Sequence, residues 1–190
     1  MWPLALVGLW QAAAQSQYEL FDYNPVANSA AVVTTGTARF TVLTPQLIRL
    51  EYDAGGVFED RATLAVVNRA TAVPTFTQTT TNGLLTITTS QVQLTYQVNE
   101  PFYSATLNVR SLNPNSTFQS WHPEMSNDGN LLGTIRSLDD LAVVSLNCSQ
   151  NSWIKIHDET LHCEWGLIST QGWAVYDDSS NWGLTTDYWF

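Results

Sequence analysis

The sequence predicts an all-β protein, built as an antiparallel β-sandwich. Apolar residues recur at every second position, short polar turns separate these runs, and no long stretch has the three- and four-residue spacing of an amphipathic helix. A period of two places one face of a strand inward and the other in water. Many short strands joined by polar turns favour a sandwich over a barrel.

The strands are expected to follow one another at short spacing. In residues 39–42 (RFTV) Phe40 and Val42 face inward, and residues 47–52 (LIRLEY) alternate in the same way. Thr44-Pro45 between these runs is typical of a hairpin turn, and Asn82-Gly83 is another turn before a strand. Strict alternation makes 91–98 the clearest strand. The other Thr-, Val- and Ile-rich runs expected to form strands are 64–68, 84–89, 104–110, 142–146 and 172–176.

Composition bounds the class of protein. The chain has 190 residues, enough for one well-buried domain, and with 44% hydrophobic and 13% charged residues it is not disordered. Its net charge of −10, with seven Lys and Arg in total, argues against binding to nucleic-acid phosphates or to an anionic membrane surface. Eight tryptophans and seven tyrosines are expected mostly in the core. Such rings also stack on sugars.

Residues 1–14 are expected to be a secretory signal peptide, followed by a single β-sandwich domain over 15–190. Trp2 to Trp10 form an apolar run too short to span a bilayer, and Ala12 to Ala14 offer a small-residue cleavage site. The run has no preceding Lys or Arg, so a frayed or mis-started amino terminus is the alternative. No later segment reaches transmembrane length, and the protein is expected to be secreted.

Two further features agree with secretion. Asn115-Ser116-Thr117 and Asn147-Cys148-Ser149 are N-glycosylation sequons. Cys148 and Cys163 are the only cysteines, and an even count in a secreted chain favours a disulfide. On the chain-entropy model, closing this loop would contribute about 3 kcal/mol. Two buried free thiols are the alternative.

The residues alone define no catalytic, metal or cofactor site. His157, His162 and Cys163 lie close together, but their spacing fits no common zinc pattern. The adjacent carboxylates Asp139-Asp140 and Asp177-Asp178 would point to opposite faces of a strand, whereas glycoside hydrolysis needs two carboxyl groups facing each other. The sequence contains no nucleophile elbow and no phosphate-binding glycine loop.

Four blocks in order carry a resemblance to a known family. They read ARFTVLTPQLIRLEY (38–52), VFEDRATLAVVNR (57–69), GNLLGTIRSLDDL (129–141) and GLISTQGWAVYDDSSN (166–181). Together they resemble the amino-terminal domain of glycoside hydrolase family 31, nearest to α-glucosidase-like and α-xylosidase-like members. One position departs from the family pattern, because Leu132 stands where a second glycine is usual.

The resemblance implies a galactose-mutarotase-like β-sandwich packed in front of a (β/α)8 barrel. In that family the barrel carries the catalytic aspartates and binds the α-glycoside, and neither catalytic motif is matched here. The chain would then be an enzyme part without the catalytic part, inactive alone and needing no cofactor. Its partner would be the barrel itself. A free-standing carbohydrate-binding or adhesion module and an incomplete gene product are the alternatives.

The resemblance also suggests which residues approach the substrate pocket. Loops of the sandwich would lie against the active-site face of the barrel, and the candidates are Trp121, Asn130, Arg136 and Asp139. Arg136 either pairs with Asp139 or Asp140 and holds the loop, or contacts sugar. Trp121 either fills the core near the loop base or offers a stacking face for a glucosyl unit, and Trp173 is expected in the core.

Overall fold

The all-β prediction is confirmed. The computed structural model describes residues 24–63, 65–132, 154–156, 159–161, 163, 165–180 and 183–184. Within these ranges the strands form antiparallel sheets, and the one helical element is a 3-10 turn, Ser29–Ala31. No helix in the described part of the chain is long and apolar enough to cross a membrane.

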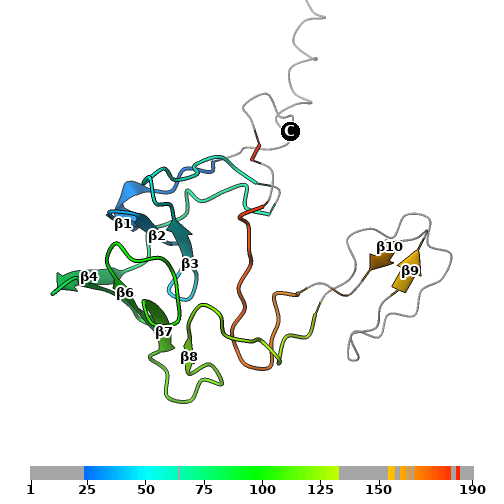
Figure 1. The fold of residues 1–190 in the computed structure, drawn as a ribbon. Coiled ribbons are helices and arrows are strands. Elements are labelled where there is room, and N and C mark those ends of the chain that lie inside the picture. The colour runs from blue at the N-terminus through cyan, green and yellow to red at the C-terminus, as the bar shows by residue number, and fades with distance from the viewer. Residues whose placement is uncertain are drawn as a thin grey trace, which may run out of the picture.

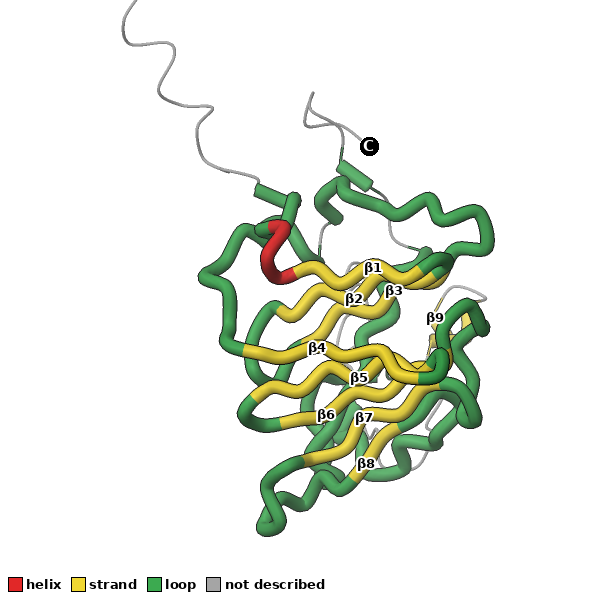
Figure 2. The backbone as a smooth tube through the Cα atoms, turned by 90° about the vertical axis from the view of Figure 1, so that its left-hand side faces the viewer, coloured by secondary structure: helices red, strands yellow, loops and turns green. Residues whose placement is uncertain are grey.

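Two sheets form the body of the molecule (Figures 1 and 2). The first has the order β1-β2-β3, with bounds Val32–Thr35, Ala38–Val42 and Ile48–Tyr52. The second has the order β4-β5-β6-β7-β8, with bounds Phe76–Thr81, Leu84–Thr89, Val92–Gln97, Leu107–Ser111 and Ser120–Trp121. Every neighbour in both sheets follows its partner in sequence, so each sheet is a simple meander.

The core lies between the two sheets. Phe40 from β2 and Tyr96 from β6 are fully buried, and their ring centroids lie 5.2 Å apart. The inward residues of β2 and β6 are the ones that the alternation predicted, because strand side chains point to opposite faces in turn. The buried cluster consists of Val33, Ala38, Phe40, Val42, Leu85, Ile87, Leu94, Tyr96 and Leu107. Contributions from both sheets make this a sandwich.

Turn chemistry fixes the register of the hairpins. Asn82 and Gly83 have φ values of 51° and 77°, and Thr81 pairs with Leu84 across them. Two central residues with positive φ define the type I′ turn, which matches the twist of the flanking strands. The turn between β2 and β3 also forms as predicted, with the Thr44 hydroxyl accepting from the backbone N–H of Leu47 at 2.9 Å.

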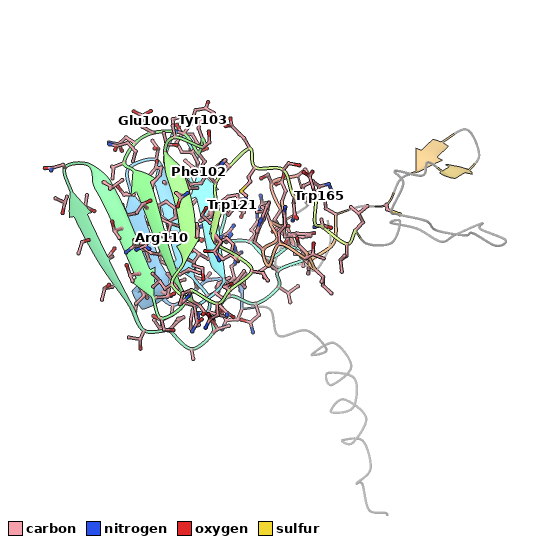
Figure 3. All side chains as sticks on the ribbon, turned by 90° about the horizontal axis from the view of Figure 1, so that it is seen from below. Glu100, Phe102, Tyr103, Arg110, Trp121 and Trp165 are labelled. Carbon is pink, nitrogen blue, oxygen red and sulfur yellow. The ribbon has the colours of Figure 1, made fainter. Side chains whose placement is uncertain are left out.

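A further hairpin lies apart from the sandwich. β9 (Ile154–Ile156) and β10 (Glu159–Leu161) pair with each other in a two-stranded sheet. In Figures 1 and 3 this hairpin stands away from the two large sheets. An isolated two-stranded hairpin is at best marginally stable in water.

The strand expected at 172–176 does not form. The strand expected at 64–68 does not form either, because residues 65–67 are irregular. Neither segment finds a partner strand in the described part of the chain, although Asn68 makes an isolated bridge with Asn24. The run at 104–110 becomes a strand only from Leu107. The run at 142–146 lies outside the described residues. β4, which was not expected, is almost wholly exposed and polar, so it gives no alternating apolar signal.

Candidate functional site

Asn130, one of the pocket-loop candidates, ties two distant segments together. Its side-chain amide donates to the carbonyl oxygen of Gly166 at 2.9 Å, and its side-chain oxygen accepts from the N–H of Gly166 at 3.0 Å. The same oxygen accepts from the N–H of Leu132 at 2.8 Å. An isolated antiparallel bridge between Asn130 and Ser169 continues this pairing. Parts of the third and fourth resemblance blocks, 129–132 and 166–169, therefore lie side by side.

Asn127 also joins the two segments through hydrogen bonds, a role that the sequence analysis did not predict. It is buried, its side-chain oxygen accepts from the Ser169 hydroxyl at 2.7 Å, and its amide donates to the Trp173 carbonyl at 3.2 Å. Buried polar side chains are normally hydrogen-bonded, and here both bonds of the Asn127 side chain go to residues 169–173 and hold that segment in place. A polar residue in the loop SNDGN gives no sequence signal for this role.

Leu132 adopts a backbone conformation that favours glycine. Its φ is 58°, in the left-handed region where an L side chain crowds the following carbonyl. This is the position at which the family pattern usually has a second glycine. Leu132 therefore carries the strain of a left-handed backbone.

Four large apolar side chains near this junction face water. Leu131, Trp165, Leu167 and Ile168 are 57%, 59%, 72% and 68% exposed, and we call them the exposed apolar segment. They lie on neighbouring backbones, because the N–H of Leu131 donates to the carbonyl of Ile168 at 2.9 Å. Figure 3 shows Trp165 on the side of the molecule away from the two sheets. Large apolar residues gathered in water mark an interaction surface more often than scattered ones.

Trp121 lies at the last strand of the second sheet. It is partly buried, packs against the core cluster, and its ring centroid is 6.3 Å from that of Trp173. Trp173 is half-buried as well. Figure 3 shows Trp121 between the sheet and Trp165. The choice between core filling and sugar stacking for Trp121 stays open as a prediction.

A charged network covers the outer face of the first sheet. Arg39 donates to both carboxylate oxygens of Glu51 at 2.7 and 2.8 Å and to Asp60 at 2.7 Å. Burial by itself lowers the pKa of Arg39, but hydrogen bonds to Glu51 and Asp60 outweigh it and raise the pKa. Bidentate pairs of this kind are the strongest arginine contacts. Arg39 therefore stays charged and fastens the loop after β3 to the sheet.

Arg69 is a buried cation held by backbone carbonyls. It donates to Pro25 O at 2.5 Å and to Asp60 O at 3.2 Å, and also to Arg61 O. Burial lowers its pKa. Its contacts join the segment before β1 to the loop after β3. Lys and Arg side chains are rarely buried unless hydrogen bonds compensate for the lost water. Arg69 therefore has a structural role and holds these two segments together.

The remaining site predictions fall in different places. Asn115 is exposed, in the loop between β7 and β8, as a glycosylation acceptor needs to be. Arg136, Asp139, Asn147 and Cys148 lie outside the described residues. Cys163 is buried and disulfide-bonded, and its pairing with Cys148 stays a prediction. Within the described ranges no group of three or more His, Cys, Asp or Glu side chains is placed to hold a metal ion.

Comparison with known proteins gives no family assignment. No model of a protein family matches the chain, and no curated protein matches it.

Proposed function

We propose that this chain is the non-catalytic amino-terminal β-sandwich of a secreted family 31 glycoside hydrolase of the α-glucosidase type. In this proposal the sandwich docks on a catalytic barrel, stabilises it and forms one wall of the pocket for a terminal α-linked glycosyl unit. The hydrolysis itself, retaining and through a covalent intermediate, belongs to the barrel. The chain contributes shape and contact area.

The observation that carries the proposal is the exposed apolar segment. It sits where the third and fourth blocks of the resemblance meet, and it leaves Trp165, Leu167 and Ile168 largely in water. An interface core is depleted in charge and enriched in aromatic and aliphatic side chains, and this segment has that composition. A barrel packed against it would bury these side chains.

Leu132 gives independent support to the resemblance. A left-handed backbone, with φ of 58°, occurs at the position where the family pattern has a glycine. A chance match of sequence blocks carries no such expectation about backbone conformation. The β-sandwich architecture agrees with the proposal at the coarser level.

A paired substitution tests the docking surface in the isolated chain. We expect Leu167→Asp together with Ile168→Asp to reduce the formation of large aggregates by the isolated chain, because both apolar side chains then carry charge. Val57→Asp is the matched control, since Val57 is 77% exposed but lies in the loop after β3. Equal effects of both substitutions, measured by light scattering, would argue against a specific surface.

The native protein provides the decisive measurement. We expect the intact mass of the secreted protein to exceed that of this chain with its glycans, and residues 165–168 to exchange amide hydrogens more slowly in the longer protein. A native mass equal to that of this chain, together with tight glucan binding that Trp121→Ala abolishes, would establish the free-standing binding module instead.

A further inference from the structure

β4 forms an open edge of the second sheet. It is first in the order β4-β5-β6-β7-β8, so among the strands that the structure describes only one of its sides is paired. Five of its six residues, 77–81, are exposed and Phe76 is half-buried. In Figure 1 β4 lies on the left-hand side of the sandwich, away from the exposed apolar segment, and in Figure 2 it faces the viewer.

The hairpin turn shows which backbone groups point outward. Thr81 and Leu84 flank the two-residue turn, so they exchange hydrogen bonds, and the alternation then assigns Thr79 and Thr77 to hydrogen-bonded pairs as well. The N–H and C=O groups of Phe76, Gln78 and Thr80 therefore point away from β5. Among the described residues no backbone hydrogen bond reaches these three from another segment.

Sheet edges are normally blocked by charge, proline, a bulge or a very short strand. β4 has none of these: it runs for six residues, its register with β5 is unbroken, and no Asp, Glu, Lys or Arg occurs anywhere in residues 70–99. The edges at the other strands differ. β3 carries Arg49 and Glu51, β8 has two residues, and β1 has four.

The charge distribution favours a second copy as the partner. Two chains of net charge −10 repel each other, and the repulsion is weakest where no charged residue lies. Residues 70–99, which include β4, β5 and β6, are such a region. A strand that pairs antiparallel with its own copy across a two-fold axis satisfies the same groups on both sides.

We propose that β4 is a self-association edge, through which two copies of this chain join their five-stranded sheets into one continuous antiparallel sheet. With the axis at Gln78, Phe76 of each copy pairs with Thr80 of the other, and Gln78 pairs with Gln78. Each hydrogen-bonded pair exchanges two bonds, so about six backbone hydrogen bonds join the copies. The interface uses backbone groups and is separate from the exposed apolar segment.

The test compares three variants of the full chain by light scattering and sedimentation over a concentration series. The wild type is expected to form a dimer. Gln78→Pro removes an outward N–H without breaking the β4–β5 ladder, because proline is tolerated on an edge strand, and it is expected to give a monomer. Gln78→Ala keeps the N–H and should still dimerise. Leu167→Asp, which alters only the exposed apolar segment, should leave the dimer unchanged.

Amide hydrogen exchange provides a readout that does not depend on a variant folding. In the wild type, protection of Phe76, Gln78 and Thr80 should rise with concentration, while Thr77, Thr79 and Thr81 stay protected throughout. A wild type that remains a monomer at every concentration overturns the proposal. So does a dimer that Gln78→Pro leaves intact, that Leu167→Asp dissociates, or that leaves the three outward amides unprotected.

Discussion

The Glu59 carboxylate shows how one contact sets the charge of a side chain. Arg61 donates to both of its oxygens, at 2.9 Å from Nε and 2.6 Å from Nη2, and these bonds lower the pKa of Glu59 from 4.5 to about 2. The pKa is depressed in the folded state, so the stabilisation is complete above pH 4.5 and is lost as the pH falls toward 2. Since the Glu59 and Arg61 side chains are 42% and 59% exposed, it amounts to less than about 1 kcal/mol.

A carbon-13 NMR titration of the Glu59 carboxyl group checks this assignment. We expect a midpoint of about 2 in the wild type, and a return toward 4.5 in Arg61→Gln, which cannot form the ion pair. Thermal unfolding of Arg61→Gln should differ little from that of the wild type, because exposed ion pairs contribute little to stability. An unshifted midpoint in the wild type would show that the pair does not form in solution.

Leu132 gives a second prediction for single residues. Replacement by glycine relieves the strain of a left-handed backbone, which costs an L residue about 1 to 2 kcal/mol. Glycine also raises the conformational entropy of the unfolded chain, which lowers the stability of the fold. We expect Leu132→Gly to be neutral or to stabilise the fold by up to about 1 kcal/mol. Leu131→Gly, at the neighbouring position without a positive φ, should destabilise by about 1 kcal/mol. Chemical denaturation of both variants distinguishes them, and equal losses would contradict the strain at Leu132.

At the scale of elements, two kinds of pairing hold the structure. Within the sheets, backbone hydrogen bonds join neighbouring strands. Between the sheets, inward side chains such as Phe40 and Tyr96 pack against each other. Around the candidate site the described residues form no regular ladder, and side-chain amides connect the segments instead. Asn130 and Asn127 connect 127–132 to 166–173 through four hydrogen bonds between 2.7 and 3.2 Å.

Removing the Asn130 amide should therefore release one segment and leave the sandwich intact. We expect Asn130→Ala to lower the free energy of local opening of the 166–169 segment by about 1 to 3 kcal/mol, because the backbone groups of Gly166 and Leu132 lose their partner. Amide exchange at Gly166 should accelerate, while exchange at core residues such as Leu94 should not. Asn108→Ala, on β7, is the control. A variant that loses protection throughout the sandwich would show that the junction is part of the global fold.

At the scale of the whole molecule, the sandwich presents two different surfaces. One carries the exposed apolar segment near the Asn130 junction, and the other is the uncharged open edge of β4. The first suits the docking of a further domain, and the second suits a copy of the same strand. The charged network of Arg39, Glu51 and Asp60 covers a third side and holds the loop after β3.

The proposed function makes a clear prediction for activity. The purified 190-residue chain should not hydrolyse aryl α-glucosides, maltose or α-xylosides, because the family's catalytic aspartates lie on the barrel. A discontinuous assay with each substrate measures this directly. Turnover that co-purifies with the chain and disappears when one of its own carboxylates is mutated would contradict the proposal.

The sequence by itself determined the strands whose two faces differ. In β2, β5 and β6 the apolar residues of the buried face recur at every second position, and Asn82-Gly83 marks its turn because only certain residues tolerate positive φ. Tertiary structure decided the rest. β4 is a strand because β5 offers it a ladder, although its own residues are mostly exposed and have no period. The irregular path at 172–176 has an alternating sequence but no described neighbour to pair with. Arg69 and Asn130 look like surface residues in the sequence, and their roles depend on carbonyl and amide groups that only the folded chain brings within reach.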